Sequence, residues 1–293
     1  MKKIDIHIHT NLYKGIERFS GGTYASPEEI ISMYEKLGIG KGVLLPEINA
    51  ECAFQVQSNE EVSYITQQYP DTFYWFCNIN PLMGSNSTDT DFTYFLDYYK
   101  KLGAKGVGEV TANMYFDDPY MENLFSHCEK CQMPVIFHMA HKKGNCYGLI
   151  DDMGLPRLEK ELIKFPKLKF LGHSQTFWAE IGNDLTEEKR RGYPKGKVIP
   201  GRVVELMRKY PSLCGDLSAG SGYNALTRDP EFGYQFIEEF QDKLYFGTDI
   251  CDPRNDMKLS LWLDKAFEQG KISKAAYEKV CFGNVLDLLG GQV

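Results

Sequence analysis

Short apolar runs recur along the chain, and each is followed by a stretch whose apolar residues have helical spacing. Runs of about four to eight residues between turn signals are typical of buried strands. The pattern predicts strands over Lys3–His9, Gly42–Leu45, Tyr74–Asn78, Lys105–Val110, Pro134–His138, Leu168–His173, Leu213–Leu217 and Leu244–Asp249.

The intervening stretches predict helices, several of which end at a turn signal such as Gly38 or Gly103. They cover Pro27–Leu37, Glu60–Tyr69, Asp91–Leu102, Pro119–Cys131, Leu155–Phe165, Arg202–Tyr210 and Pro230–Phe240, with two more after the eighth strand, Met257–Gln269 and Ser273–Leu289. Strict alternation of strand and helix indicates an α/β fold, either a (β/α)8 TIM barrel or a doubly wound open sheet.

Polar residues at the strand ends favour the barrel. Glu109, His138, His173 and Asp249 end predicted strands and are separated by one or two βα repeats of about 30 residues or more. In a barrel these ends converge on one rim, whereas an open sheet spreads them along an edge. We therefore predict a (β/α)8 TIM barrel with extra C-terminal helices.

The first predicted strand, Lys3–His9, carries the most informative motif. Alternation along a strand sends Asp5, His7 and His9 to one face and the isoleucines to the other. Two histidines on a half-exposed strand are common, but two adjacent imidazoles can also bind one divalent ion from the same side. Because one shared cation would satisfy all the strand-end groups together, the pattern favours a metal centre.

Length and composition indicate one domain over residues 1–293, since no linker or low-complexity tract divides the chain and 43% of residues are hydrophobic. A formal charge of −7 argues against a nucleic-acid partner, and no apolar run is long enough to span a membrane. Eight scattered cysteines suit a cytoplasmic location, and Cys128 and Cys131 are best explained as buried helix thiols. A homo-oligomer is compatible with this composition.

Several motifs together resemble the amidohydrolase superfamily, and the match runs in order along nearly the whole chain. They are His7-x-His9, Glu109, Pro134–His138, Gly172-His173 and Gly247-Thr248-Asp249. Within the superfamily the chain most resembles the amidohydrolase-2 group, which includes aminocarboxymuconate-semialdehyde decarboxylase and related metal-dependent decarboxylases. The segment 106–109 is also similar to the fourth strand of TatD-type deoxyribonucleases.

The resemblance implies that His7, His9 and Asp249 hold a divalent metal ion, with His138 the next ligand. Zinc is the expected ion and manganese the alternative, with one or two ions in each chain.

Glu109 and His173 complete the implied set. The resemblance gives Glu109 the role of a bridging or terminal ligand, while His173 either binds a second ion or forms a hydrogen bond with the substrate. Many amidohydrolases carry a carbamylated lysine on this strand, but Lys105 lies about 13 Å towards the opposite rim and is expected to be structural.

The implied activity is hydrolysis of an amide, ester or lactone bond in a small molecule, with Asp249 as general base and His173 stabilising the oxyanion. The alternative is metal-dependent, non-oxidative decarboxylation of an aromatic or muconate-like acid. A TatD-like nuclease is less attractive for an acidic chain. A barrel that binds metal without catalysing a reaction is a further alternative.

Residues near the predicted rim are candidates for contacting the substrate. Trp178, in the long loop Ser174–Pro200, could form a wall of the pocket, and Arg254 could bind a substrate carboxylate. The same loop carries five cationic residues, for which a solvated lid or subunit contact is the better interpretation. Asp216 and Ser218 are candidates for supporting the metal ligands.

Overall fold

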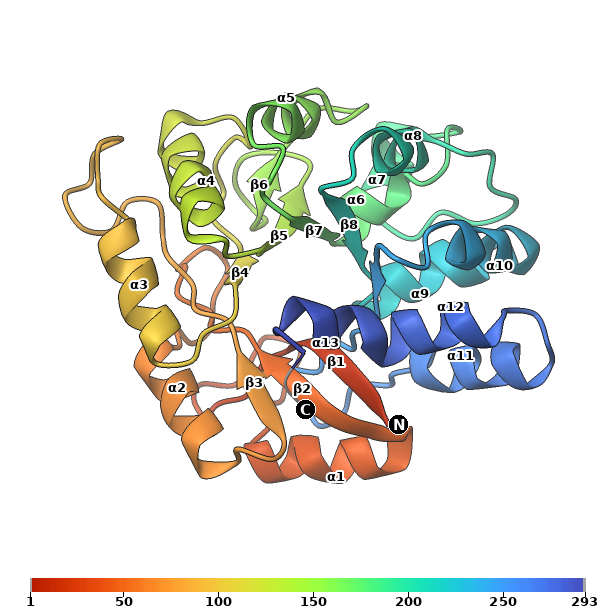
Figure 1. The fold of residues 1–293 in the computed structure, drawn as a ribbon, viewed down its shortest axis with the longest axis horizontal. Helices are drawn as coiled ribbons and strands as arrows, with labels where there is room; N and C mark the ends of the chain where they lie inside the picture. Colours follow the sequence, from red (N-terminus) through yellow and green to blue (C-terminus); the bar gives the residue numbers. More distant parts are fainter. Residues whose placement is uncertain (1, 292–293) are drawn as a thin grey trace.

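The computed structural model describes residues 2–291, in which strands and helices alternate around a common centre (Figure 1). The strands are β1 (Lys3–Ile8), β2 (Ile39–Leu44), β3 (Phe73–Trp75), β4 (Val107–Val110), β5 (Val135–Ala140), β6 (Leu149–Ile150), β7 (Phe170–His173), β8 (Leu213–Asp216) and β9 (Leu244–Tyr245). All except the short β6 correspond to predicted strands.

The strands form two parallel sheets, in the orders β1-β2-β3 and β4-β5-β7-β8-β9, with β6 paired to β5. Isolated backbone bridges join the sheets at both edges, from Cys77 to Val107 and from Ile8 to Ile250. Each barrel strand thus lies beside its predecessor, without the reversal of order that defines a doubly wound sheet. The predicted α/β barrel is confirmed, although continuous ladders do not close it.

The predicted helices are present with small shifts at their ends. They are α1 (Pro27–Leu37), α2 (Asn59–Gln68), α3 (Thr93–Lys101), α4 (Pro119–Cys131), α5 (Pro156–Lys164), α8 (Arg202–Lys209), α10 (Pro230–Glu239) and α11 (Leu259–Glu268). The capping box of Ser26 and Glu29 begins α1, and Gly38 ends it in the left-handed conformation. These local signals explain why the bounds of α1 were predictable.

Other helices differ from the prediction. The predicted helix Ser273–Leu289 is divided into α12 (Lys274–Glu278), the π-helix η1 (Lys279–Gly283) and α13 (Asn284–Leu288). Three short helices were not predicted: α6 (Gln175–Ala179), α7 (Glu187–Arg190) and α9 (Ala219–Thr227). Because α6 and α7 lie within residues 174–200, that segment is not the single loop expected from the sequence.

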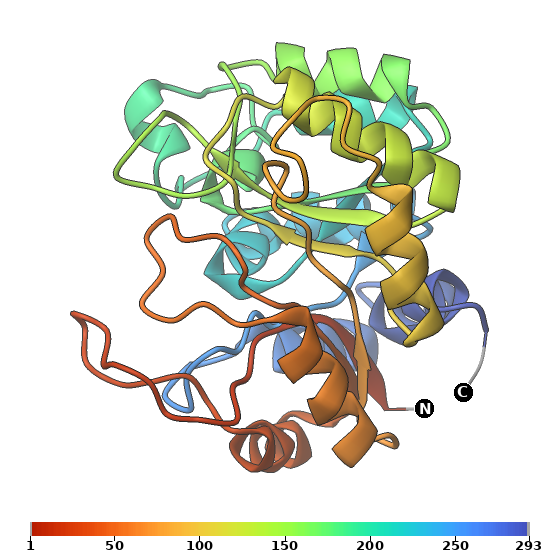
Figure 2. The ribbon, with the colours of Figure 1, turned by 90° about the vertical axis from the view of Figure 1, so that its left-hand side faces the viewer.

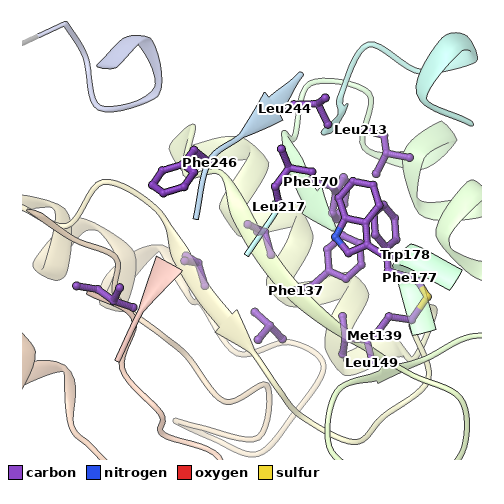
Figure 3. Close-up of a cluster of buried hydrophobic side chains, with 14 of the residues drawn as sticks. Phe137, Met139, Leu149, Phe170, Phe177, Trp178, Leu213, Leu217, Leu244 and Phe246 are labelled. Atoms are coloured by element: carbon purple, nitrogen blue, oxygen red, sulfur yellow. The ribbon is translucent and has the colours of Figure 1, made fainter. Parts of the chain in front are cut away.

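The apolar core consists of two clusters, one inside the barrel and one between the strands and the surrounding helices. The inner cluster takes residues from the strands and closes on α13, and includes Ile4, Ile6, Val43, Leu45, Phe76, Ile136, Leu171, Cys214, Tyr245, Val285 and Leu289. In the outer cluster, Phe137, Phe170, Phe177 and Trp178 pack together between β5, β7, β8 and the neighbouring helices (Figure 3).

β1 does not follow the predicted alternation. Ile4 and Ile6 belong to the inner cluster, but Ile8 belongs to the outer cluster with Tyr34, whose hydroxyl donates to Asp5. The register of β1 against β2 shifts between Asp5 and Ile8, as at a β-bulge. The prediction that Ile8 shares a face with Ile4 and Ile6 is therefore wrong, because the shift reverses the facing of the residues that follow it.

The end of the barrel that carries the long loops lies opposite the chain termini. The long segments that follow β1 and β2 project away from the side on which both ends of the chain are found (Figure 2). Strand ends and loops at this face are where barrels of this type place their functional groups. No helix within residues 2–291 has the length and apolar character needed to cross a membrane.

One buried charge in α5 gives a prediction about stability. Glu161 is fully buried, and neither carboxylate oxygen has a hydrogen-bond partner among residues 2–291. Burial, reinforced by the nearby Glu122, raises the pKa of Glu161 to about 7. A raised pKa means that the folded state binds more protons than the unfolded state, so the charged group destabilises the fold as pH rises from about 4.5 to 7.

We expect Glu161→Met to raise the free energy of unfolding by about 1–3 kcal/mol at pH 8 and to change it little at pH 4. Urea unfolding at both pH values measures the effect, with the exposed Glu35→Met on α1 as the control. An equal gain at both pH values would contradict the electrostatic explanation.

Candidate metal centre

The predicted strand-end residues meet at one point of the barrel rim. The Nε2 atoms of His7 and His9 lie 3.0 Å apart, and Asp249 Oδ1 lies 3.6 Å from the first and 3.5 Å from the second. Glu109 Oε2 lies 3.6 Å from both nitrogens. Atoms that share one ion at about 2.1 Å are about 3.0–3.5 Å from one another, so this spacing fits a common cation.

Backbone hydrogen bonds between β1 and the segment after β9 place Asp249 in this group. Asp249 lies beyond β9 rather than at the end of a strand, with φ of 58°. Its N–H donates to the carbonyl of His7 at 2.7 Å, and the N–H of His9 donates to Ile250 at 2.9 Å. These two bonds hold the carboxylate beside both imidazoles.

Hydrogen bonds on the far side of each imidazole determine which nitrogen faces the cluster with a lone pair. His7 Nδ1 lies 2.6 Å from Asp216 Oδ2, and His9 Nδ1 lies 2.8 Å from the carbonyl of Leu45. Since both partners are acceptors, the Nδ1 atoms carry the hydrogens and the neutral rings present lone pairs at Nε2. Two lone pairs facing each other at 3.0 Å repel unless a proton or a metal ion lies between them, so the donor set fits a metal ion.

The two oxygens of Glu109 face different groups of ligands. Oε2 faces His7 and His9, while Oε1 lies 2.8 Å from His138 Nδ1 and 3.7 Å from His173 Nε2. Two sets of donor atoms therefore adjoin each other, one from His7, His9 and Asp249 and one from Glu109, His138 and His173. A carboxylate in this position can bridge two ions.

The electrostatics of the cluster also favour a cation. Burial lowers the pKa of His7, but the carboxylates of Asp216, Glu109 and Asp249 outweigh burial and hold it well above its usual range. Burial also raises the pKa of Asp249, to about 6, because the neighbouring histidines compensate only part of the desolvation. The buried carboxylates thus create a field that attracts positive charge.

His173 differs from the other histidines of the cluster. Burial, together with the adjacent His7, lowers the pKa of His173 to about 3, so the ring is neutral at physiological pH. Its Nδ1 lies 2.9 Å from Ser218 Oγ, while its Nε2 faces Glu109 and Asp249. A neutral imidazole here is suited either to bind an ion or to contact a substrate.

Asp216 and Ser218 lie behind the ligands, as the sequence suggested. Trp178 contributes indirectly, because its indole N–H donates to the carbonyl of Asp216 at 2.8 Å. The Trp178 ring itself is buried in the outer cluster (Figure 3) and does not line the cavity described below. The structure therefore places Trp178 beneath the site rather than at its wall.

A cavity of about 260 Å³ opens onto the cluster. It is lined by His9, Arg18, Tyr24, Glu47, Asn49, Glu51, Cys52, Ala53, Phe54, Glu109, Thr111, Tyr147, Asp249 and Cys251. Pockets for drug-sized ligands are usually about 300–1,000 Å³, so this cavity, just below that range, suits a smaller molecule.

Several predicted residues lie away from this cavity. The guanidinium of Arg254 contacts both oxygens of Asp252 and the carbonyl of Gly21, and Arg254 does not line the cavity. Lys105 precedes β4, whereas Glu109 lies within it, and Lys105 does not line the cavity either. Arg254 is therefore engaged by Asp252, and Lys105 lies outside the site.

The cationic segment 189–197 does not present five free charges. Arg190 is 1% exposed, and its guanidinium binds Glu180 and the carbonyls of Asp151 and Asp152. Lys189 binds Asp184. These contacts anchor the segment to the barrel.

Sequence reasoning missed the cavity wall formed by Arg18, Tyr24, Glu47 and Tyr147. The Arg18 guanidinium lies 4.2 Å from the centre of the Tyr24 ring, and the Tyr24 hydroxyl donates to Glu47. These residues come from irregular segments, which carry no periodic signal from which a side-chain direction could be predicted.

The fold that carries the site is shared with solved structures. No family model matches the chain, and no curated protein is similar to it in sequence. Among solved structures, an uncharacterised TIM-barrel protein from Bordetella bronchiseptica superposes with a TM-score of 0.69 at 20% identity, with 100% of both chains covered. The TIM-barrel fold is thus established by structural comparison.

Two further structures have described activities. A probable 2-pyrone-4,6-dicarboxylic acid hydrolase from Acinetobacter baumannii gives a TM-score of 0.63 at 18% identity over 99% of this chain and 100% of the other. A dihydroxybenzoic acid decarboxylase from Polaromonas, with bound manganese, gives 0.61 at 14% identity over 100% and 98%. The chain therefore shares its fold with structures described as a hydrolase and as a decarboxylase.

Proposed function

We propose that the chain is a metal-dependent hydrolase of the amidohydrolase-2 group that cleaves an amide, ester or lactone bond in a small molecule. The observation that carries the proposal is the convergence of the His7 and His9 Nε2 atoms with the carboxylates of Glu109 and Asp249 beside a cavity. Similar folds occur in a probable 2-pyrone-4,6-dicarboxylic acid hydrolase and in a dihydroxybenzoic acid decarboxylase.

A divalent ion held by this cluster would polarise the scissile carbonyl and lower the pKa of a coordinated water to about 7. Asp249 lines the cavity, and burial brings its pKa to about 6, close to the pH at which it would work. Asp249 accordingly takes a proton from the attacking water and later returns it to the leaving group. Neutral His173 donates to the carbonyl oxygen if it is not occupied as a ligand.

The test is a screen of lactones, esters, amides and aromatic acids with the metal-loaded protein, read as new acid or as carbon dioxide. We expect new carboxylic acid, with turnover lost on chelation and restored by zinc or manganese. Carbon dioxide without hydrolysis would favour the second candidate, a decarboxylase, which the structural similarity to dihydroxybenzoate decarboxylases supports. Chelator-insensitive turnover would contradict both.

The number of ions depends on Glu109. We expect the protein to bind one ion tightly at His7, His9 and Asp249 and a second, weaker ion at Glu109, His138 and His173. Glu109→Gln should weaken or abolish the second site and lower activity, because the bridging carboxylate becomes an amide with one oxygen. The first ion should remain bound by His7, His9 and Asp249. Titration of metal-free protein with zinc while bound ions are counted measures this.

Glu51→Gln provides a control for the Glu109 experiment, since the half-buried Glu51 lines the same cavity but lies outside both donor sets. Saturation at one ion, unchanged in Glu109→Gln, would refute the bridging role.

A further inference from the structure

Tyr147 lies against the candidate metal centre, although no motif pointed to it. It follows β5 in the segment that leads to β6, and lines the cavity together with Glu109 and Asp249. Its ring centre lies 4.3 Å from that of His138, with the two planes tilted by 44°. The phenol ring is thus held against a potential metal ligand.

Asn113 fixes the loop that carries Tyr147. Its side-chain amide donates to the carbonyls of Lys142 and Gly148, at 3.1 and 3.2 Å, and accepts from the N–H of Gly144 at 2.7 Å. One side chain therefore joins the start, the tip and the end of the segment that bears Tyr147. The position of the ring is held by specific bonds rather than by packing alone.

Gly148 allows the loop to approach His138 closely. It has φ of 106°, and its N–H donates to the carbonyl of Thr111 at 2.7 Å. A Cβ atom here would lie 2.6 Å from the His138 carbonyl oxygen and 2.8 Å from its ring carbon Cδ2, which no side chain can tolerate. Glycine next to Tyr147 is therefore required for the phenol to stand over His138.

The hydroxyl of Tyr147 has no hydrogen-bond partner among the residues that the structure describes, 2–291. Tyr147 is 40% exposed where it lines the cavity, and a phenol, whose ordinary pKa is about 10, keeps its proton at neutral pH. A protonated donor without a partner, beside the group of metal ligands, is available to an acceptor on a molecule in the cavity.

We propose that Tyr147 is a further catalytic residue, whose hydroxyl donates a hydrogen bond to the carbonyl oxygen of the scissile bond. This inference rests on the proposed hydrolase function. As water adds to the carbonyl, negative charge develops on this oxygen, and the hydrogen bond strengthens while the proton stays on the phenol. Tyr147 thus acts in the transition state more than in the initial complex.

The test compares Tyr147→Phe with the wild-type, metal-loaded enzyme on the best hydrolysed lactone or ester from the screen. We expect kcat to fall about a hundredfold, the effect of removing one oxyanion donor, with little change in KM or in bound metal. Tyr115→Phe is the control, since Tyr115 is 43% exposed and does not line the cavity.

The outcomes separate this inference from the function on which it rests. A wild-type kcat in Tyr147→Phe, or a rise in KM alone, would overturn the catalytic role of Tyr147 while leaving the hydrolase intact. Lower metal content in Tyr147→Phe, with kcat restored by added metal, would assign Tyr147 to support of His138 and would also overturn it. A wild-type enzyme that hydrolyses nothing would overturn both.

Discussion

Replacing both His7 and His9 by alanine is expected to leave a folded protein that binds no metal at the tight site. The two Nε2 atoms lie 3.0 Å apart and are the only ligands that come from β1 and its end among the described residues. Their loss leaves only the carboxylates of Asp249 and Glu109 at this position, which hold a transition-metal ion weakly without the imidazoles. Hydrolysis should therefore become undetectable.

Metal content after gel filtration, measured by mass spectrometry, tests the His7 and His9 prediction, with circular dichroism reporting the fold. The matched control replaces His127 and His141, which lie outside the donor clusters of residues 2–291. Full metal occupancy in the His7→Ala, His9→Ala protein would refute the assignment. Equal loss in the control protein would show that the effect is not specific to the site.

Asp249→Asn is expected to lower kcat by about 10²- to 10⁴-fold, the usual contribution of a general base. Asparagine keeps the shape and one oxygen of Asp249, but cannot accept the proton of the attacking water. Burial holds the pKa of Asp249 near 6, so it is largely ionised at pH 7 yet basic enough to act. Metal affinity should fall as well, because a neutral amide replaces a charged ligand.

Kinetics at saturating zinc separate the proton-transfer role of Asp249 from its role as a ligand. Asp256→Asn is the matched control, since this exposed carboxylate pairs with Lys258 and does not line the cavity. If Asp249→Asn turned over at a near wild-type rate once saturated with metal, another base would have to act.

The site residues that end predicted strands could be identified from the sequence because parallel barrel strands bring their carboxyl ends together. The positions of these strand ends depend only on strand order and length, which the apolar runs of the chain define. His138 and His173 illustrate it, as the register of β5 against β7 pairs these two residues directly. Their proximity follows from topology alone.

Features that depend on contacts distant in sequence could not be predicted. The register shift in β1 changes which side of the strand Ile8 faces, but nothing in Lys3–His9 marks it. The carbonyl of Leu45 fixes the tautomer of His9, and any residue type could have supplied that oxygen. Tyr147 is placed by Asn113, whose side chain acts across a loop that has no periodic pattern.

The seam between β1 and the segment after β9 has a consequence for the whole fold. There, single backbone bonds such as that from Asp249 to His7 replace a continuous ladder. An ion shared by His7, His9 and Asp249 would therefore work as a non-covalent cross-link between the two ends of the barrel, in the way that a disulfide joins distant parts of a chain. In this protein the metal ion would stabilise the closure of the barrel as well as take part in the reaction.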